Sequence, residues 1–244
     1  MNELLYYEDA NLREFDATVT AVESTDGGVR VALDRTAFYP GGGGQPNDTG
    51  VPVVDGAQVP VTKVKKEGDT VWHWLGTDGG EPSITPGAAV HGAVNWDRRY
   101  ALMRTHTAMH ILCGVVWRDY GAQVTGGNMD PGKGRMDFEF ESLTRDLIPA
   151  DRGGVQCRGG GGSPGADPDS APGRSVPDSG SDPHRSTCCR RASPRYFTVG
   201  NREAGLAGGR RHPHVDNTAD VGAIRVTDYK SKGKINKRIY IELG

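Results

Sequence analysis

The first third of the chain contains short stretches in which apolar and polar residues alternate. Five segments show this pattern, which is typical of strands: residues 15–22, 29–33, 61–64, 70–75 and 88–94. Asp26-Gly27-Gly28 separates the first two segments and Glu67-Gly68-Asp69 separates the next two, and both triplets are typical of hairpin turns. The pattern predicts a small antiparallel β-barrel.

The spacing of apolar residues changes to a helical period between Arg98 and Tyr120. Leu102, Met109, Leu112 and Val116 are among the residues that recur in this way, so the pattern predicts one amphipathic helix.

Strand character returns near the end of the chain. Residues 223–226 and 238–243 predict two strands, with the basic stretch 230–234 as the turn between them.

Residues 151–214 differ in composition from the rest of the chain. They contain 13 Gly, 10 Arg, 7 Pro and 7 Ser but no Lys. Such a segment buries too little apolar surface to offset its chain entropy, so we expect it to be largely disordered. It is either a flexible linker or basic arm, or the product of translating a GC-rich gene in the wrong frame. The absence of lysine favours the second explanation.

These elements predict an α+β chain in two domains. An N-terminal β-barrel domain is expected over residues 1–93, and an α+β domain over residues 94–244 that is interrupted by the low-complexity segment 151–213.

Charge is unevenly distributed along a chain whose formal net charge is −2. Residues 1–150 carry 21 acidic and 13 basic side chains, whereas residues 151–244 carry 10 and 16. A polyanion would prefer the second part, although an uneven surface charge can also be merely solvated.

The four cysteines lack paired Cys-x-x-Cys spacing, and no leader or membrane span is evident. We therefore expect a soluble, cytoplasmic protein.

Two histidines stand one helical turn apart in the predicted helix. His106 and His110 leave the same face, a spacing that suits two ligands of one zinc ion or, alternatively, two surface histidines. His214 is a third candidate ligand. Cys113 faces roughly the same way, but a cysteine at such a position more often packs in a core.

A glycine-rich stretch is the second candidate site. Gly41 to Gly44 follow Phe38-Tyr39-Pro40, and their backbone N–H groups could approach a ligand closely because glycine lacks Cβ. Thr36 and Gln45 flank the glycines and could hydrogen-bond a small polar substrate. A glycine run by itself more often marks an ordinary loop.

Together, these motifs resemble the alanyl-tRNA editing proteins and the editing domain of alanyl-tRNA synthetase. Phe38 to Gly50 match the pattern Phe-Tyr-Pro-x-Gly-Gly-Gly-Gln-x-x-Asp-x-Gly, and Arg104 to His110 match Arg-x-His-Thr-Ala-x-His. A third motif is matched only from His214 onwards, through Asn217-Thr218 to Val221-Gly222. The resemblance covers about 1–150 and 214–244.

The resemblance implies a β-barrel followed by a zinc-dependent α+β editing domain. Its zinc would lie between His106, His110 and a Cys-x-x-x-His pair, of which only His214 is present, because Arg210 stands at the cysteine position and a guanidinium cannot bind a metal.

The resemblance also implies that Thr36 would recognise the hydroxyl of a seryl group. We expect Thr36 and Gln45 to be catalytic, and Gly42, Gly43 and Lys232 to bind substrate. Lys230 and Lys234 are further candidate tRNA contacts, or simply part of an exposed basic turn.

The implied reaction is hydrolysis of serine or glycine from mischarged alanine tRNA, without a membrane or an obligate protein partner. Two alternatives remain open: a metal-dependent hydrolase of a small ester, and an inactive tRNA-binding remnant.

Overall fold

The computed structural model describes residues 2–26, 28–54, 57–76, 83–140 and 212–244. The disorder predicted for 151–213 falls, up to residue 211, outside these ranges. His212 and Pro213 have defined positions. Among the described helices, none combines the length and the apolar character needed to cross a membrane.

The described elements follow one another as β1 (Glu3–Leu4), the 3-10 helix η1 (Leu5–Tyr7), β2 (Glu14–Thr25), β3 (Gly28–Leu33), β4 (Arg35–Thr36), β5 (Gly50–Val54), β6 (Ala57–Gln58), β7 (Val61–Glu67), β8 (Thr70–Leu75), β9 (Ala89–Val94), α1 (Trp96–Tyr120), β10 (Gln123–Asp130), β11 (Lys133–Glu139), the 3-10 helix η4 (Thr218–Val221), β12 (Ile224–Ser231) and β13 (Asn236–Leu243).

Seven of the N-terminal strands form one sheet in the order β6-β5-β7-β8-β3-β2-β9, while β1 and β4 form a separate parallel pair. All pairs in the seven-stranded sheet are antiparallel, and β5 also pairs with β9, so the pairing continues from the last strand back to β5. The β5–β7 contact is a single pair, Gly50 with Val61. An antiparallel N-terminal sheet is confirmed, while its description as a barrel remains a prediction.

Alternation along the strands creates the core of this sheet. In β2, Phe15, Ala17 and Val19 are buried while their neighbours are exposed, as expected for a strand with one face inward. These residues pack with Val31, Phe38 and other apolar side chains. The local sequence pattern therefore decides which face is buried.

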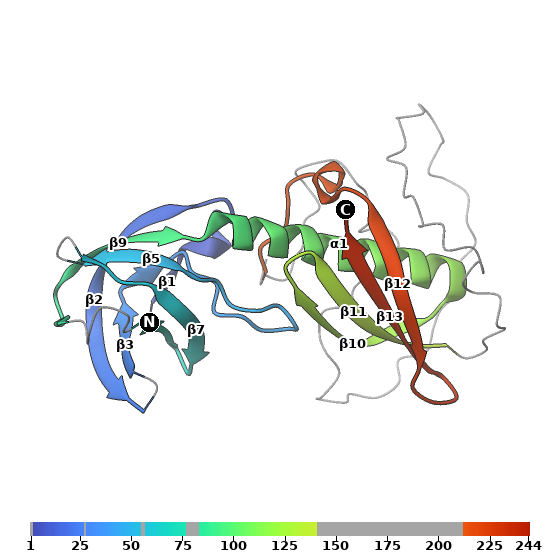
Figure 1. Cartoon of the computed structure of the whole chain (residues 1–244), viewed down its shortest axis with the longest axis horizontal. Helices are drawn as coiled ribbons and strands as arrows, with labels where there is room; N and C mark the ends of the chain where they lie inside the picture. The colour runs from blue at the N-terminus through green and yellow to red at the C-terminus, as the bar shows by residue number, and fades with distance from the viewer. Residues whose placement is uncertain (1, 27, 55–56, 77–82, 141–211) are drawn as a thin grey trace, which may run out of the picture.

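Helix α1 extends from this sheet and lies along a second one (Figure 1). Asn95 caps its N-terminus by accepting from Arg98 N, and Gly121 ends it with φ +63°. Its buried residues include Leu102 and Met103, which join the core of the antiparallel sheet β10-β11-β13-β12. The predicted helix is confirmed.

Two details of the C-terminal sheet differ from the sequence-based expectation. Strands β10 and β11 were not predicted. Lys230 and Ser231 belong to β12, so the turn begins only at Lys232. Pairing with β13 extends β12 beyond the apolar residues that identified it.

A buried ion pair connects α1 to the glycine-rich loop, residues 40–48. Arg99 and Asp48 are both completely buried, and Arg99 Nε lies 2.8 Å from Asp48 Oδ2. The same carboxylate oxygen accepts from Tyr39 N at 2.7 Å, so one residue ties the two ends of the loop together. Arg99 also donates to the carbonyls of Ala10 and Ala37. The loop is thereby joined to the first turn of the helix.

Replacing Arg99 by leucine is expected to lower the free energy of unfolding by about 3–5 kcal/mol, because it leaves the Asp48 carboxylate buried without its partner. The matched control is Arg118→Leu, which removes an ion pair whose arginine side chain is 69 % exposed and is expected to cost less than about 1 kcal/mol. Urea unfolding measures both. Equal losses would mean that burial of the Arg99 pair is unimportant.

Candidate metal centre beside the glycine-rich loop

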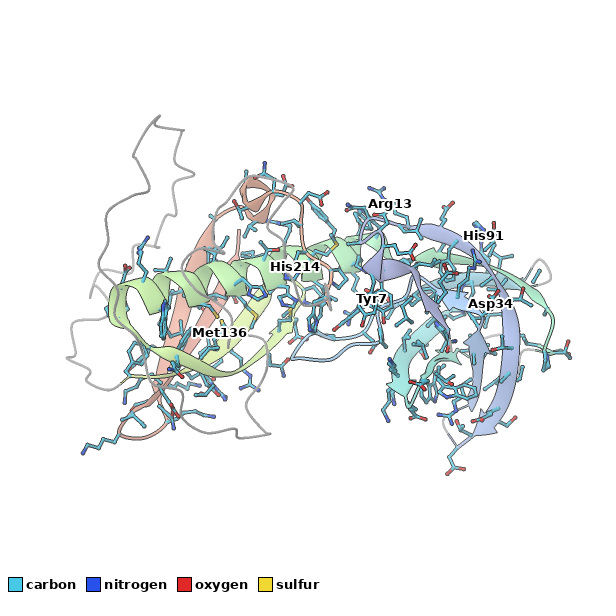
Figure 2. All side chains as sticks on the ribbon, turned by 180° about the vertical axis from the view of Figure 1, so that it is seen from behind. Tyr7, Arg13, Asp34, His91, Met136 and His214 are labelled. Carbon is cyan, nitrogen blue, oxygen red and sulfur yellow. The ribbon has the colours of Figure 1, made fainter. Side chains whose placement is uncertain are left out.

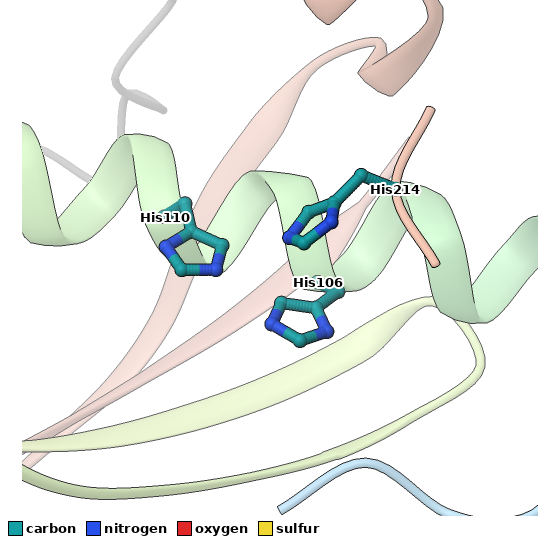
Figure 3. A group of neighbouring side chains, drawn as sticks. All are labelled: His106, His110 and His214. Carbon is teal, nitrogen blue, oxygen red and sulfur yellow. The ribbon is translucent and has the colours of Figure 1, made fainter. Parts of the chain in front are cut away.

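Three of the predicted site residues come together in space. The candidate ligand atoms of His106, His110 and His214 all lie within 4.8 Å of one another. His106 and His110 project from α1 one turn apart with nearly parallel rings, and His214 reaches them from the segment that precedes η4 (Figure 3). Figure 2 shows His214 near the middle of the molecule, between the two sheets. Tertiary structure thus brings together one ligand pair from the helix and one residue from far along the chain.

Burial keeps His106 neutral. Its side chain is 3 % exposed, and desolvation lowers its pKa well below the usual value, with the neighbouring His214, His110 and His212 adding to the effect. A neutral imidazole is the form that binds a metal ion.

Gln45 orients the His106 ring. Its Oε1 lies 2.6 Å from His106 Nδ1. Because an amide oxygen only accepts hydrogen bonds, Nδ1 carries the proton and Nε2 keeps its lone pair. Polar partners of this kind commonly hold a metal-ligating histidine in the required tautomer. Gln45 is 3 % exposed, and its Nε2 has no hydrogen-bond partner among the described residues.

The glycines of the loop mainly permit close packing within the protein. A Cβ on Gly44 would lie 2.5 Å from Gly127 O of β10, and Gly44 O accepts from Met129 N at 3.0 Å. A Cβ on Gly43 would lie 2.8 Å from His212 Cε1. Around Gly42, by contrast, the nearest such contact is Tyr39 Oη at 3.7 Å. Of the two predicted substrate-binding glycines, Gly42 has room beside it, whereas Gly43 is covered by His212.

His212 is a site residue that the sequence interpretation missed. Its ring centre lies 5.0 Å from that of His106, and its Nδ1 lies 2.5 Å from Tyr39 Oη. It stands only two positions before His214, and a His-x-His spacing was the available signal. The arginine- and glycine-rich composition around it concealed that signal.

Thr36 lies in β4, is completely buried, and has its hydroxyl already engaged. His73 Nδ1 lies 3.2 Å from Val31 O and must donate to it, so His73 Nε2 accepts the Thr36 hydroxyl proton at 2.9 Å. Thr36 Oγ1 in turn accepts from Phe38 N at 3.1 Å. These hydrogen bonds link Thr36 to His73 and Phe38, and not to the three histidines.

Lys232 lies apart from the histidines. The turn between β12 and β13 is at one end of the molecule, whereas His214 is near its middle (Figures 1 and 2). Lys232 Nζ is 3.9 Å from Asp137, and its side chain is 46 % exposed. Its predicted substrate contact would have to be made at a distance from the metal centre.

Cys113 packs in the core and does not join the ligand group. It is 6 % exposed, and its Sγ lies 3.7 Å from Met136 Sδ. These contacts fit the alternative that Cys113 packs in a core.

The donor set suits zinc in number and chemistry. Three imidazoles leave a fourth position for water or substrate, as in catalytic zinc sites. Two Zn–N bonds of about 2.0–2.1 Å at the tetrahedral angle place their nitrogens about 3.4 Å apart, so the three rings must draw closer when an ion binds. His110 and His214 are only half-buried.

Comparison with known proteins finds one family model and several relatives. Residues 2–98 match the family model described as tRNA synthetases class II (A). An alanyl-tRNA editing protein AlaX-M of Methanosarcina mazei is 41 % identical over 150 residues, which are 60 % of this chain and 59 % of that protein. The chain is similar to the alanyl-tRNA editing proteins.

Further relatives extend the similarity to a longer enzyme. AlaX-M of Saccharolobus solfataricus is 42 % identical over 144 residues, covering 58 % of each protein. The alanine–tRNA ligase of Pyrococcus furiosus is 43 % identical over 137 residues, which are 55 % of this chain and 14 % of the ligase. The chain thus spans about three fifths of the length of the AlaX-M proteins that it matches.

The buried His73 is expected to make stability depend on pH. Burial lowers its pKa from 6.5 to about 4. Above pH 6.5 the imidazole is neutral in both folded and unfolded chains and adds no pH dependence. Between pH 6.5 and about 4 only the unfolded chain takes up the proton. The free energy of unfolding therefore decreases as the pH is lowered through this range, by an amount on the order of 3 kcal/mol.

Urea unfolding at pH 7.5 and pH 5, compared with His73→Gln, isolates this contribution. The glutamine does not titrate, so the variant should lose less stability between the two pH values. An identical loss in both proteins would show that His73 is not responsible.

Proposed function

We propose that this chain hydrolyses the ester that joins serine or glycine to the 3′ end of alanine tRNA, using a zinc ion held by His106, His110 and His214. The observation that carries the proposal is the convergence of these three imidazoles beside Gln45, whose amide nitrogen is buried and unpartnered among the described residues. Similarity to the alanyl-tRNA editing proteins supports the choice of substrate.

The histidines would hold the ion and leave one position open. Gln45 keeps the His106 Nε2 lone pair available by accepting from Nδ1. A zinc ion bound there would act as a Lewis acid on the ester carbonyl or lower the pKa of the attacking water.

Two polar groups near the loop are available to the aminoacyl part of the substrate. Gln45 Nε2 carries two N–H donors, which a carbonyl or carboxylate-like oxygen would satisfy. The Thr36 hydroxyl uses its proton and one lone pair within the protein, which leaves a second lone pair able to accept from the serine hydroxyl. Alanine has no such donor, so this contact would favour serine over alanine.

The tRNA body would be contacted at a distance from the metal. Lys230, Lys232 and Lys234 lie at the β12–β13 end of the C-terminal sheet and carry exposed ammonium groups. Contacts of this kind release counterions from the phosphates, so the tRNA affinity should fall as salt rises.

Zinc content and deacylation together test the proposal. The purified chain should hold about one zinc ion and release serine from mischarged alanine tRNA, while leaving correctly attached alanine in place. His110→Ala and His214→Ala should each lose both the metal and the serine release. His91→Ala is the matched control, because His91 is half exposed and pairs with Asp16 on the N-terminal sheet.

Other outcomes would favour the alternatives. A chain without zinc and without serine release would be an inactive relative. Metal-dependent cleavage of 4-nitrophenyl acetate with no binding to tRNA, even at low salt, would identify a hydrolase of small esters.

Gln45→Leu tests the hydrogen bond that orients His106 while keeping all three candidate metal ligands. The substitution keeps the side-chain size but leaves His106 Nδ1–H buried without a partner, and it should weaken zinc binding about 10- to 100-fold. Competition with a chromogenic zinc chelator measures the affinity. Unchanged affinity would show that Gln45 does not orient His106 for the metal.

A further inference from the structure

The third histidine belongs to a segment without regular secondary structure. Residues 212–216, termed here the ligand segment, lie outside every helix and strand. His106 and His110 are held rigidly by α1, but no strand ladder holds His214. Contacts between the ligand segment and the rest of the protein must therefore set the position of His214.

Several contacts join the ligand segment to other parts of the described chain, and three hydrogen bonds are among them. Val215 N donates to Thr107 Oγ1 at 3.4 Å, which is long for a hydrogen bond. Asn11 Nδ2 donates to Asp216 Oδ2 at 3.0 Å in an exposed position, where water competes. The third, at 2.5 Å and half-buried, joins His212 Nδ1 to Tyr39 Oη and is the shortest of the three.

The glycine-rich loop is shaped to receive the His212 ring. Gly43 has φ +59°, and a Cβ there would approach His212 Cε1 to 2.8 Å and Nε2 to 3.1 Å. Real Cβ atoms do not come so close, so the ring occupies space that exists only because residue 43 is glycine.

We propose that Tyr39, Gly43 and His212 form a latch that holds the ligand segment against the glycine-rich loop and so positions His214 for the metal. His212 is a positioning residue and not a ligand: the group of nitrogens within 4.8 Å consists of His106, His110 and His214 alone among the described residues. The inference rests on the proposed metal site. Its physical basis is that a ligand held in place beforehand loses less freedom when the ion binds.

Cobalt titration of the purified full chain tests the latch, because Co²⁺ accepts the same imidazole donors and its visible spectrum reports the ligand set. Tyr39→Phe and His212→Ala should each weaken Co²⁺ binding about 10- to 100-fold, as loss of a supporting partner does. The spectrum at saturation should not change. The double variant should bind much more tightly than the product of the two single effects predicts, since both substitutions remove the Tyr39–His212 contact and Tyr39→Phe removes in addition only the long 3.4 Å contact of Tyr39 Oη with Gly42 O.

His212→Asn tests whether the hydrogen bond is what matters. The asparagine side chain is short and places a polar atom near the position of Nδ1, so it should restore most of the affinity lost in His212→Ala. Tyr120→Phe is the control for loss of a tyrosine hydroxyl, because Tyr120 is 49 % exposed on the last turn of α1.

Gly43→Ala tests the latch from the side of the loop and has a closely matched control. Gly68 has φ +60°, nearly the same as Gly43, but a Cβ there would meet nothing within 4 Å. Both alanine substitutions strain the backbone alike, and only Gly43→Ala displaces His212. It alone should weaken Co²⁺ binding, with circular dichroism confirming that both variants are folded.

The results separate the latch from the metal site on which it depends. Unchanged cobalt affinity in Tyr39→Phe and His212→Ala would overturn the latch while leaving the three-histidine site intact. A changed spectrum at saturation in His212→Ala would make His212 a ligand and would also overturn its positioning role. A wild-type chain that binds no cobalt would overturn the proposed metal site, and the latch with it.

Discussion

The buried ion pair between Arg99 and Asp48 is the constraint on which the candidate site depends. It joins the first turn of α1 to the far end of the glycine-rich loop, and both side chains are completely buried. His106 follows Arg99 by two helical turns and therefore leaves the same face of α1. Once this pair is made, the loop lies along that face and Gln45 comes within hydrogen-bond distance of His106. An interaction within the fold thus sets the geometry of the candidate metal centre.

Most polar and conformational features of the loop serve the protein itself. Asp48 closes the loop, Gly44 lets it approach β10, and Gly43 makes room for His212. Thr36 of β4 is hydrogen-bonded to His73 of β8. The groups that remain for a substrate are few, chiefly the Gln45 amide nitrogen and the space beside Gly42. A small set of donors in a buried setting suits a small, chemically defined part of a substrate such as an aminoacyl group.

The resemblance to the alanyl-tRNA editing proteins is weakest in the motif around His214, where the structure shows contacts that the sequence did not predict. The motif that contains the third histidine is matched only from His214 onwards. His214 nevertheless lies beside the helical pair, and His212 just before it contacts Tyr39 in the best-matched motif. Contacts made by these few residues, and not the length of matched sequence, decide whether the three imidazoles meet.

The sequence by itself determined many of the elements and the helical half of the site. Alternation identified β2, β3, β8 and β9, and the helical period identified α1 with His106 and His110 on one face, because these patterns are local consequences of backbone geometry. Strand β10 escaped prediction because residues 123–130 contain two glycines and little alternation.

Only tertiary structure decided the other contacts. Tyr39 and His212 are 173 positions apart, Gln45 and His106 are 61 apart, and Thr36 and His73 are 37 apart. No local pattern reports such pairs, since they form only when packed elements bring distant side chains together.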